Sequence, residues 1–195
     1  MKRVLIGLFA LVCLAGATAQ DIAVGPIIVW DVVTQKVADT STTTTDELLI
    51  GATVPIVLRG GLEVAPELLL ILDSDSDTTG FSFGAGLYWA LNKAGVFQLK
   101  TGPKLMLTMY SEYNNVSKSD DENFGRFGMA ISVPLIADLA VSKMFTLRLV
   151  QPVVTLNWST NSYTNVLTQK VVNSAFSFDT FYSGFLPTFI FLFKF

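Results

Sequence analysis

Apolar and charged residues alternate along segment 62–73, and this alternation constrains the fold more than any other feature of the chain. Leucine and valine dominate one parity of the segment, whereas its carboxylates, Glu63, Glu67 and Asp73, all share the other. Because successive side chains of a β-strand point to opposite faces, the pattern predicts a strand with one uncharged face. Segment 96–112 shows the same separation, with its lysines opposite its apolar row.

Turn and loop signals divide the chain into eight apolar segments, each long enough to cross a bilayer as a tilted strand of about 9–11 residues. The segments cover residues 21–34, 47–59, 62–73, 80–91, 96–112, 125–141, 145–158 and 176–195. Their connections alternate between tight turns and polar, mostly longer loops. The turns are Gly60-Gly61, 92–95 and 142–144, and the loops are 35–46, 74–79, 113–124 and 159–175. An even number of antiparallel strands places all tight turns at one end of the fold and all loops at the other.

Residues 1–19 have the layout of a removable signal peptide. The parts are a basic start, an apolar centre and small residues at a cleavage site, namely Lys2 with Arg3, residues 4–14, and Ala17 with Ala19. The apolar centre is shorter than the about 20 residues that a membrane-spanning helix needs. We therefore expect cleavage after Ala19, which leaves one domain, residues 20–195.

Hydrophobic residues make up 51% of the chain, yet no run of 18 apolar residues follows the signal peptide. The longest candidate, residues 127–141, contains Pro134 and Asp138. A membrane protein without spanning helices satisfies its backbone hydrogen bonds in lipid only as a closed barrel. We therefore predict an all-β fold, an antiparallel eight-stranded transmembrane up-and-down β-barrel. A soluble β-sandwich with one charged face also alternates in this way, so other features have to distinguish the two folds.

Aromatic residues favour the membrane barrel over the sandwich. The tryptophans Trp30, Trp89 and Trp158 lie on apolar rows near strand ends, where barrels place aromatic girdles at the membrane interfaces. The chain stops on an unbroken aromatic row made by Phe189, Phe191, Phe193 and Phe195. On a soluble protein such a row is an aggregation-prone edge, whereas on a barrel it faces lipid.

The charged residues on the opposite parity are expected to point into the barrel and to form a network. They are Asp31, Arg59, Glu63, Glu67, Lys100, Lys104, Arg126, Asp138 and Arg148. Because both signs occur at similar depths and unpaired buried charge is costly, we expect these groups to pair across the lumen. An eight-stranded barrel is just wide enough to be filled by side chains or to hold one small ligand. The network therefore plugs the barrel, or it lines a narrow path for solutes.

The final strand, with alternating aromatics and a C-terminal phenylalanine, resembles the recognition signal of bacterial outer-membrane proteins. The glycine-alternating stretch GFSFGAGLYW at 80–89 also looks like strands of that group. Residues 21–195 thus resemble the small eight-stranded superfamily that includes the OmpA barrel, OmpX, OmpW and the opacity-type proteins. The resemblance implies a location in the outer membrane of a diderm bacterium, and a barrel-assembly machinery that reads Phe191, Phe193 and Phe195. The likeness to OmpW-type barrels also suggests a path for small hydrophobic compounds.

Missing residue types narrow the function. The chain has no histidine, and its single cysteine, Cys13, lies in the signal peptide, so we expect no enzyme, no cofactor and no metal site. Removing Lys2 and Arg3 lowers the basic count from 13 to 11 against 16 acidic residues, which argues against nucleic-acid binding. We expect an integral envelope barrel, structural or a narrow porin-like channel for small and hydrophobic solutes, monomeric, with outer-membrane lipid and the assembly machinery as partners. The alternative is a surface-exposed adhesin that acts through its external loops.

Overall fold

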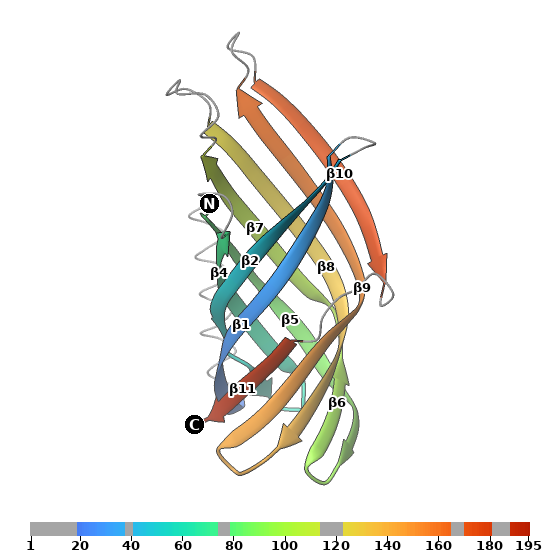
Figure 1. The fold of residues 1–195 in the computed structure, drawn as a ribbon. Helices are drawn as coiled ribbons and strands as arrows, with labels where there is room; N and C mark the ends of the chain where they lie inside the picture. The colour runs from blue at the N-terminus through green and yellow to red at the C-terminus, as the bar shows by residue number, and fades with distance from the viewer. Residues whose placement is uncertain (1–18, 38–40, 74–78, 114–122, 165–169, 181–187) are drawn as a thin grey trace.

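The computed structural model describes residues 19–37, 41–73, 79–113, 123–164, 170–180 and 188–195. Within these ranges the chain forms eleven strands of one antiparallel sheet (Figure 1). The strands are β1 (Ala19–Val37), β2 (Ser41–Thr53), β3 (Ile56–Leu58), β4 (Glu63–Asp73), β5 (Thr79–Ala94), β6 (Phe97–Thr101), β7 (Lys104–Tyr113), β8 (Asn123–Ala140), β9 (Phe145–Thr164), β10 (Lys170–Thr180) and β11 (Thr188–Lys194). In the described part of the chain, no helix is long and apolar enough to cross a membrane.

The sheet closes on itself as a ring of eight strand positions. Three positions hold two successive strands each, namely β2 with β3, β6 with β7 and β10 with β11. Two of the breaks coincide with Pro55 and Pro103, because proline has no N–H to donate to a ladder. β11 closes the ring on β1, where Lys194 is paired with Ala23. The predicted antiparallel, eight-stranded up-and-down barrel is therefore confirmed.

Tight turns connect the strands at one end of the barrel, which we call the turn end. Gly60 and Gly61 have φ angles of 95° and 81°, a left-handed conformation that glycine adopts because it has no Cβ to clash. Gly95, with a φ angle of 59°, follows β5, which runs on to Ala94, several residues past its predicted end. Residues 141–144 connect β8 to β9 at the same end, as predicted.

At the opposite end the strands are longer than predicted. β1 and β2 pair as far as Val37 and Ser41, so threonines 42–45 lie in a strand instead of the expected loop. Threonine is β-branched and fits a pleated strand well, which explains the extension. β9 and β10 are lengthened in the same way. The β8–β9 ladder shifts register between Val133 and Pro134, opposite Pro152, which marks a β-bulge where proline cannot donate a ladder hydrogen bond.

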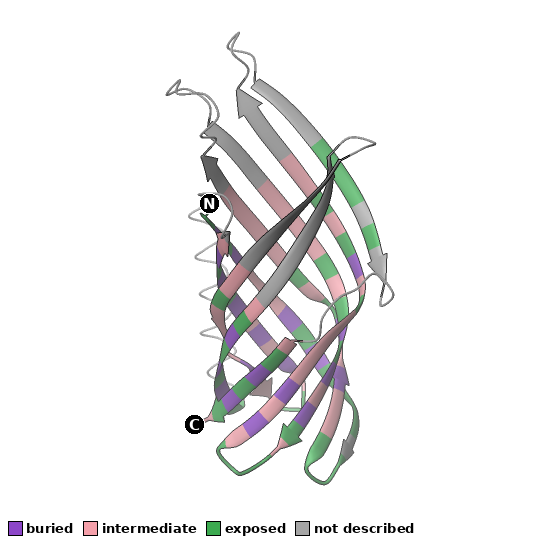
Figure 2. Cartoon of the chain, viewed as in Figure 1, coloured by how far each residue is buried: buried purple, intermediate pink, exposed green. Residues whose placement is uncertain are grey.

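The two faces of the ring carry different side chains. Leu68, Leu105 and Phe191 point outward, with 61%, 44% and 49% of their surface exposed. Glu63 and Leu69 point inward and are 1% and 8% exposed. Figure 2 shows buried and exposed residues alternating along β11. The core of the molecule therefore lies inside the ring, and large apolar side chains cover its outer face.

Candidate functional site

Four charged residues meet inside the barrel near the turn end, and we call them the charged layer. Glu63 is the first residue of β4, and Lys100 lies in β6. Asp138 lies near the end of β8, which is Ala140, and Arg148 lies near the start of β9, which is Phe145. Asp138 and Arg148 are direct partners across the β8–β9 ladder. Side chains in such cross-strand positions lie close enough to interact. The tight turns thus bring together residues that are up to 85 positions apart in the sequence.

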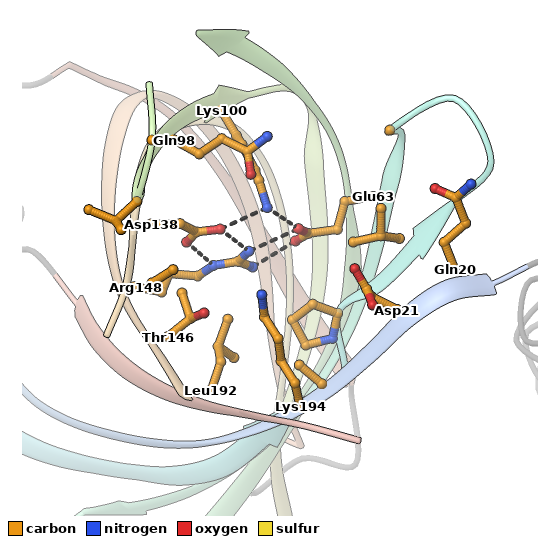
Figure 3. Close-up of a pocket in the computed structure, with 17 residues that line it drawn as sticks. Gln20, Asp21, Glu63, Gln98, Lys100, Asp138, Thr146, Arg148, Leu192 and Lys194 are labelled. Atoms are coloured by element: carbon orange, nitrogen blue, oxygen red, sulfur yellow. Dashed lines mark hydrogen bonds and ion pairs between the residues drawn. The ribbon is translucent and has the colours of Figure 1, made fainter. Parts of the chain in front are cut away.

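Arg148 is the centre of the charged layer, because it holds both carboxylates at once (Figure 3). Its Nη1 and Nη2 atoms donate to Oε1 and Oε2 of Glu63 over 2.7 and 2.9 Å. Its Nε and Nη2 atoms donate to Oδ1 and Oδ2 of Asp138 over 2.7 and 2.8 Å. The Lys100 ammonium contacts the same two carboxylates, with Nζ 2.5 Å from Glu63 Oε2 and 2.7 Å from Asp138 Oδ2. Two cations therefore share two anions.

Burial makes the pairing within the charged layer obligatory. Arg148 is 2% exposed and Lys100 is 7% exposed. An ion that leaves water for a low-dielectric interior loses several kcal/mol of hydration, which only well-placed groups of opposite charge restore. With two cations and two anions the layer has no net charge, and most of its donors and acceptors are occupied. In the described part of the chain, no group of three or more His, Cys, Asp or Glu residues is placed to hold a metal ion.

A second ion pair lies further from the turn end than the charged layer does. Its members, Glu67 in β4 and Lys104 at the start of β7, follow Glu63 and Lys100 by four residues each. The Lys104 ammonium is 2.5 Å from Glu67 Oε2. Tyr88, which is 1% exposed, packs beside this region with Ala65 and Ile136. Its ring covers Gly86 on the same inward row, so that a Cβ at that glycine would overlap the ring. The glycine therefore makes room for an aromatic side chain inside a narrow barrel.

Apolar side chains fill the lumen beside these charges. One cluster of buried residues, which we call the apolar layer, consists of Ala23, Ile27, Leu69, Ile190 and Leu192. Val29, Leu49, Met106 and Val150 pack against it. The layer joins β1, β4 and β11, so it lies at the seam where the ring closes. Charged and apolar groups thus occupy successive parts of one lumen.

A cavity of about 270 Å³ lies between the charged layer and the turn end (Figure 3), and we call it the vestibule. The charged layer forms one of its walls. Asp21, Gln98, Thr146 and Lys194 line it from β1, β6, β9 and β11. Smaller and apolar residues such as Leu192 complete the lining. The vestibule is therefore polar on several sides and bounded by a neutral ion network.

The structure brings together six of the charged residues that the sequence places in the lumen, namely Glu63, Glu67, Lys100, Lys104, Asp138 and Arg148. The prediction that Arg59 points into the lumen was wrong, because its side chain is exposed in the turn that follows β3. The chain leaves the sheet after Leu58, and strand parity does not determine where a side chain points in a turn. The side chains of Asp31 and Arg126 lie outside the described residues.

The aromatic residues singled out in the sequence lie on the outer face wherever their side chains are described. Trp89 and Trp158 are 45% and 37% exposed, whereas the side chain of Trp30 lies outside the described residues. Phe191, Phe193 and Phe195 are exposed as well. The ring of Phe145 lies 5.9 Å from that of Phe191 and 5.6 Å from that of Phe193, measured between centroids. Of the expected cleavage residues, Ala17 lies outside the described residues, and Ala19 is paired with Leu58 at the start of β1.

Sequence reasoning did not single out four residues that shape the site. Thr146 lies two residues before Arg148, and Lys194 lies two residues after Leu192. Both therefore share the inward parity of a buried residue of their own strand. Tyr88 continues the inward glycine row of β5, and Asp21 precedes Ala23 on the inward row of β1. Extending each inward row to the strand ends would have found all four.

The sequence of the chain is unlike those of the protein families and curated proteins with which it was compared. No protein-family model matches the chain, and no curated protein matches it either. Among solved structures, the chain is similar to the one titled "Crystal structure of Neisserial surface protein A (NspA)". The two are 11% identical, the match covers 89% of this chain and 90% of that one, and the TM-score is 0.42.

Proposed function

We propose that the protein is a monomeric outer-membrane barrel of the cell envelope whose lumen is closed, so that its role is structural. The observation that carries the proposal is the separation of side chains between the two faces of the ring. Large apolar residues cover the outside, while the charged layer and the Glu67–Lys104 pair lie inside. The proposed topology has the turn end in the periplasm and the longer connections outside the cell, as barrels of this type place them.

The outer face supports a lipid environment on energetic grounds. Among the exposed apolar residues, Ile28 is 68% exposed, Leu68 61% and Phe189 57%. Monomeric soluble proteins rarely expose large contiguous apolar patches, whereas lipid tails solvate such a surface. A lysine or arginine on this face at mid-membrane costs about 2–4 kcal/mol. In this proposal the outward row of Phe191, Phe193 and Phe195 is the segment that the barrel-assembly machinery reads.

The packing of the lumen supports closure over conduction. Arg148, Glu63, Lys100 and Asp138 span the lumen with direct contacts, and Tyr88 and the apolar layer fill the space beyond them. A narrow path for small apolar solutes is the second candidate, because the apolar layer offers the lining such a path needs. Adhesion through external loops concerns segments that lie largely outside the described residues.

Two measurements test the proposal. Cell fractionation followed by gel electrophoresis with and without boiling should place the protein in the outer membrane and show a heat-dependent mobility, which is typical of closed barrels. Recovery from the soluble periplasm would refute the membrane assignment. Purified protein in planar bilayers should then give no stable openings. Discrete openings would refute closure, and blockage of those openings by small apolar compounds would favour the second candidate.

A further inference from the structure

The vestibule is large enough to take a ligand rather than a single ordered water. Its volume of about 270 Å³ far exceeds the roughly 10–15 Å³ that one water molecule needs, and it approaches the lower end of typical small-ligand pockets, about 300 Å³. The charged layer closes it toward the lumen, and the remaining walls come from strands next to the tight turns. A molecule that enters from the turn end therefore reaches a cavity whose far wall is the charged layer.

One wall of the vestibule presents two hydrogen-bond donors that have no partner among the residues that the structure describes. The ammonium of Lys194 points into the cavity (Figure 3), and among the described residues it forms no ion pair. Thr146 is 3% exposed, and its hydroxyl has no hydrogen-bond partner among the described residues. Figure 3 shows this hydroxyl on the side of the cavity that Lys194 also faces. A buried hydroxyl without a protein partner is available to hydrogen-bond a molecule in the cavity.

The side of the cavity formed by β1 presents the opposite charge. The carboxylate of Asp21, an exposed residue, lines the vestibule at its rim, and within the described chain it is in none of the ion pairs. Because the charged layer is neutral, the charged side chains that line the vestibule outside it, without an ion-pair partner among the described residues, are one ammonium, on Lys194, and one carboxylate, on Asp21. A ligand that forms an ion pair with each of these two groups carries one negative and one positive charge.

We propose that the vestibule binds a small zwitterion, namely a free amino acid or a dipeptide. Its carboxylate accepts hydrogen bonds from the Lys194 ammonium and the Thr146 hydroxyl, and its ammonium donates to the Asp21 carboxylate. Hydrogen bonds between ionised groups are roughly twice as strong as neutral ones, so the two ends fix the ligand's orientation. This binding needs only the folded turn end, and its failure would leave the closed envelope barrel untouched.

The first experiment compares ligands on the purified full chain, folded in detergent micelles. Saturation-transfer NMR and calorimetric titration are run with L-alanine and with L-alanyl-L-alanine. Acetate and ethylammonium, which carry only one of the two charges, serve as matched probes. Saturable one-to-one binding of at least one zwitterion, about tenfold or more tighter than either single-charge probe, supports the proposal. Equal affinity for acetate would overturn it in favour of a simple anion site on Lys194. No saturable binding at all would also overturn it, and would indicate that water fills the cavity.

The second experiment tests whether the named groups hold the ligand. Lys194→Met and Asp21→Asn should each weaken zwitterion binding about tenfold or more, while Lys143→Met, in an exposed turn, should leave it unchanged. The double exchange of Lys194→Asp with Asp21→Lys keeps both charges and should recover binding relative to either single change. Heat-dependent gel mobility confirms that each variant is folded before titration. Unchanged binding in both single variants would refute the assignment of the site.

Discussion

The charged layer and the apolar layer are buried to similar extents in one lumen, yet they are held together by different forces. Arg148 and Glu63 in the first are 2% and 1% exposed, and Ile190 and Leu192 in the second are each 2% exposed. The charged layer depends on directional contacts of 2.5 to 2.9 Å between named atoms. The apolar layer depends on excluded water and close packing, which have no preferred direction. Burial alone therefore does not say how a position responds to change.

The difference follows from what a deletion leaves behind. Removing one partner of a buried ion pair leaves an uncompensated charge, which keeps its full desolvation penalty. Removing methyl groups from an apolar cluster leaves a cavity, whose cost grows with the volume left empty. Removing any one charge should therefore destabilise the whole charged layer. In the apolar layer, by contrast, the loss of stability should grow with the side-chain volume that is removed.

Arg148→Met should give the largest loss of stability, about 3–5 kcal/mol in the free energy of unfolding. The change removes four hydrogen bonds and leaves Glu63 and Asp138 with only Lys100 between them. Urea-induced unfolding from lipid vesicles, followed by gel mobility without boiling, measures the effect. A loss below about 1 kcal/mol would show that water reaches the layer and that its charges are not desolvated.

A combined replacement separates the cost of an uncompensated charge from the cost of an altered side-chain shape. Glu63→Gln, Lys100→Met, Asp138→Asn and Arg148→Met together remove every charge of the layer while approximately keeping side-chain volumes. Neutral replacement of an entire buried ion network is often tolerated, so most of the stability lost in the single variant should return. If the fourfold variant is as unstable as the single one, the network contributes more than mutual charge compensation.

Leu69→Ala should reduce stability by about 3 kcal/mol, because it opens a cavity within the apolar layer. The neighbouring residue Leu68 provides a matched control, since it points outward with 61% of its surface exposed. Lipid tails refill the space left on the outer face, so Leu68→Ala should cost much less under the same unfolding conditions. Equal losses at the two positions would contradict the assignment of one face to the lumen and the other to lipid.

Gly86→Ala should destabilise the barrel by about 2 kcal/mol, because overpacking of a filled interior forces its neighbours to move. A Cβ at this position would overlap the ring of Tyr88, which lies beside both the charged layer and the Glu67–Lys104 pair. Gly128→Ala is the control, since its Cβ would meet Thr108 Cβ at 3.6 Å, an ordinary contact. Comparable melting temperatures for the two variants would show that Tyr88 moves aside freely.

The sequence was sufficient to predict the fold and the inward position of all four residues of the charged layer, because one rule governs both. Strand parity separates lumen from outer face, and it placed Glu63, Lys100, Asp138 and Arg148 inside correctly by position. Parity carries no information about depth or distance between strands, however. That Arg148 contacts Glu63 across 85 residues depends on register and on the tight turns, which the sequence does not specify numerically.

The prediction was incomplete where the strand rule stops applying. Arg59 follows the last residue of β3, and its exposure depends on turn geometry rather than on parity. The vestibule was not predicted, because a cavity is a property of several strand ends together. Thr146 and Lys194 look like unremarkable strand residues until the three-dimensional arrangement shows that they face the same space.

The smallest expected loss of stability distinguishes the Glu67–Lys104 pair from the charged layer. Lys104→Met should cost about 1 kcal/mol, less than Arg148→Met, although it also leaves a carboxylate, Glu67, without its cation. The Lys104 side chain is 18% exposed and that of Glu67 is 6% exposed, so water reaches only the ammonium side of the pair. The loss is smaller because Lys104→Met leaves one carboxylate without its cation, whereas Arg148→Met removes the main partner of two. Glu67→Gln combined with Lys104→Met should restore most of the loss, since no ion then remains to be compensated. Unfolding measured in parallel for the single and double variants checks both statements. If Lys104→Met proves as costly as Arg148→Met, the pair is as dry as the charged layer, and desolvation extends through the lumen beyond Tyr88.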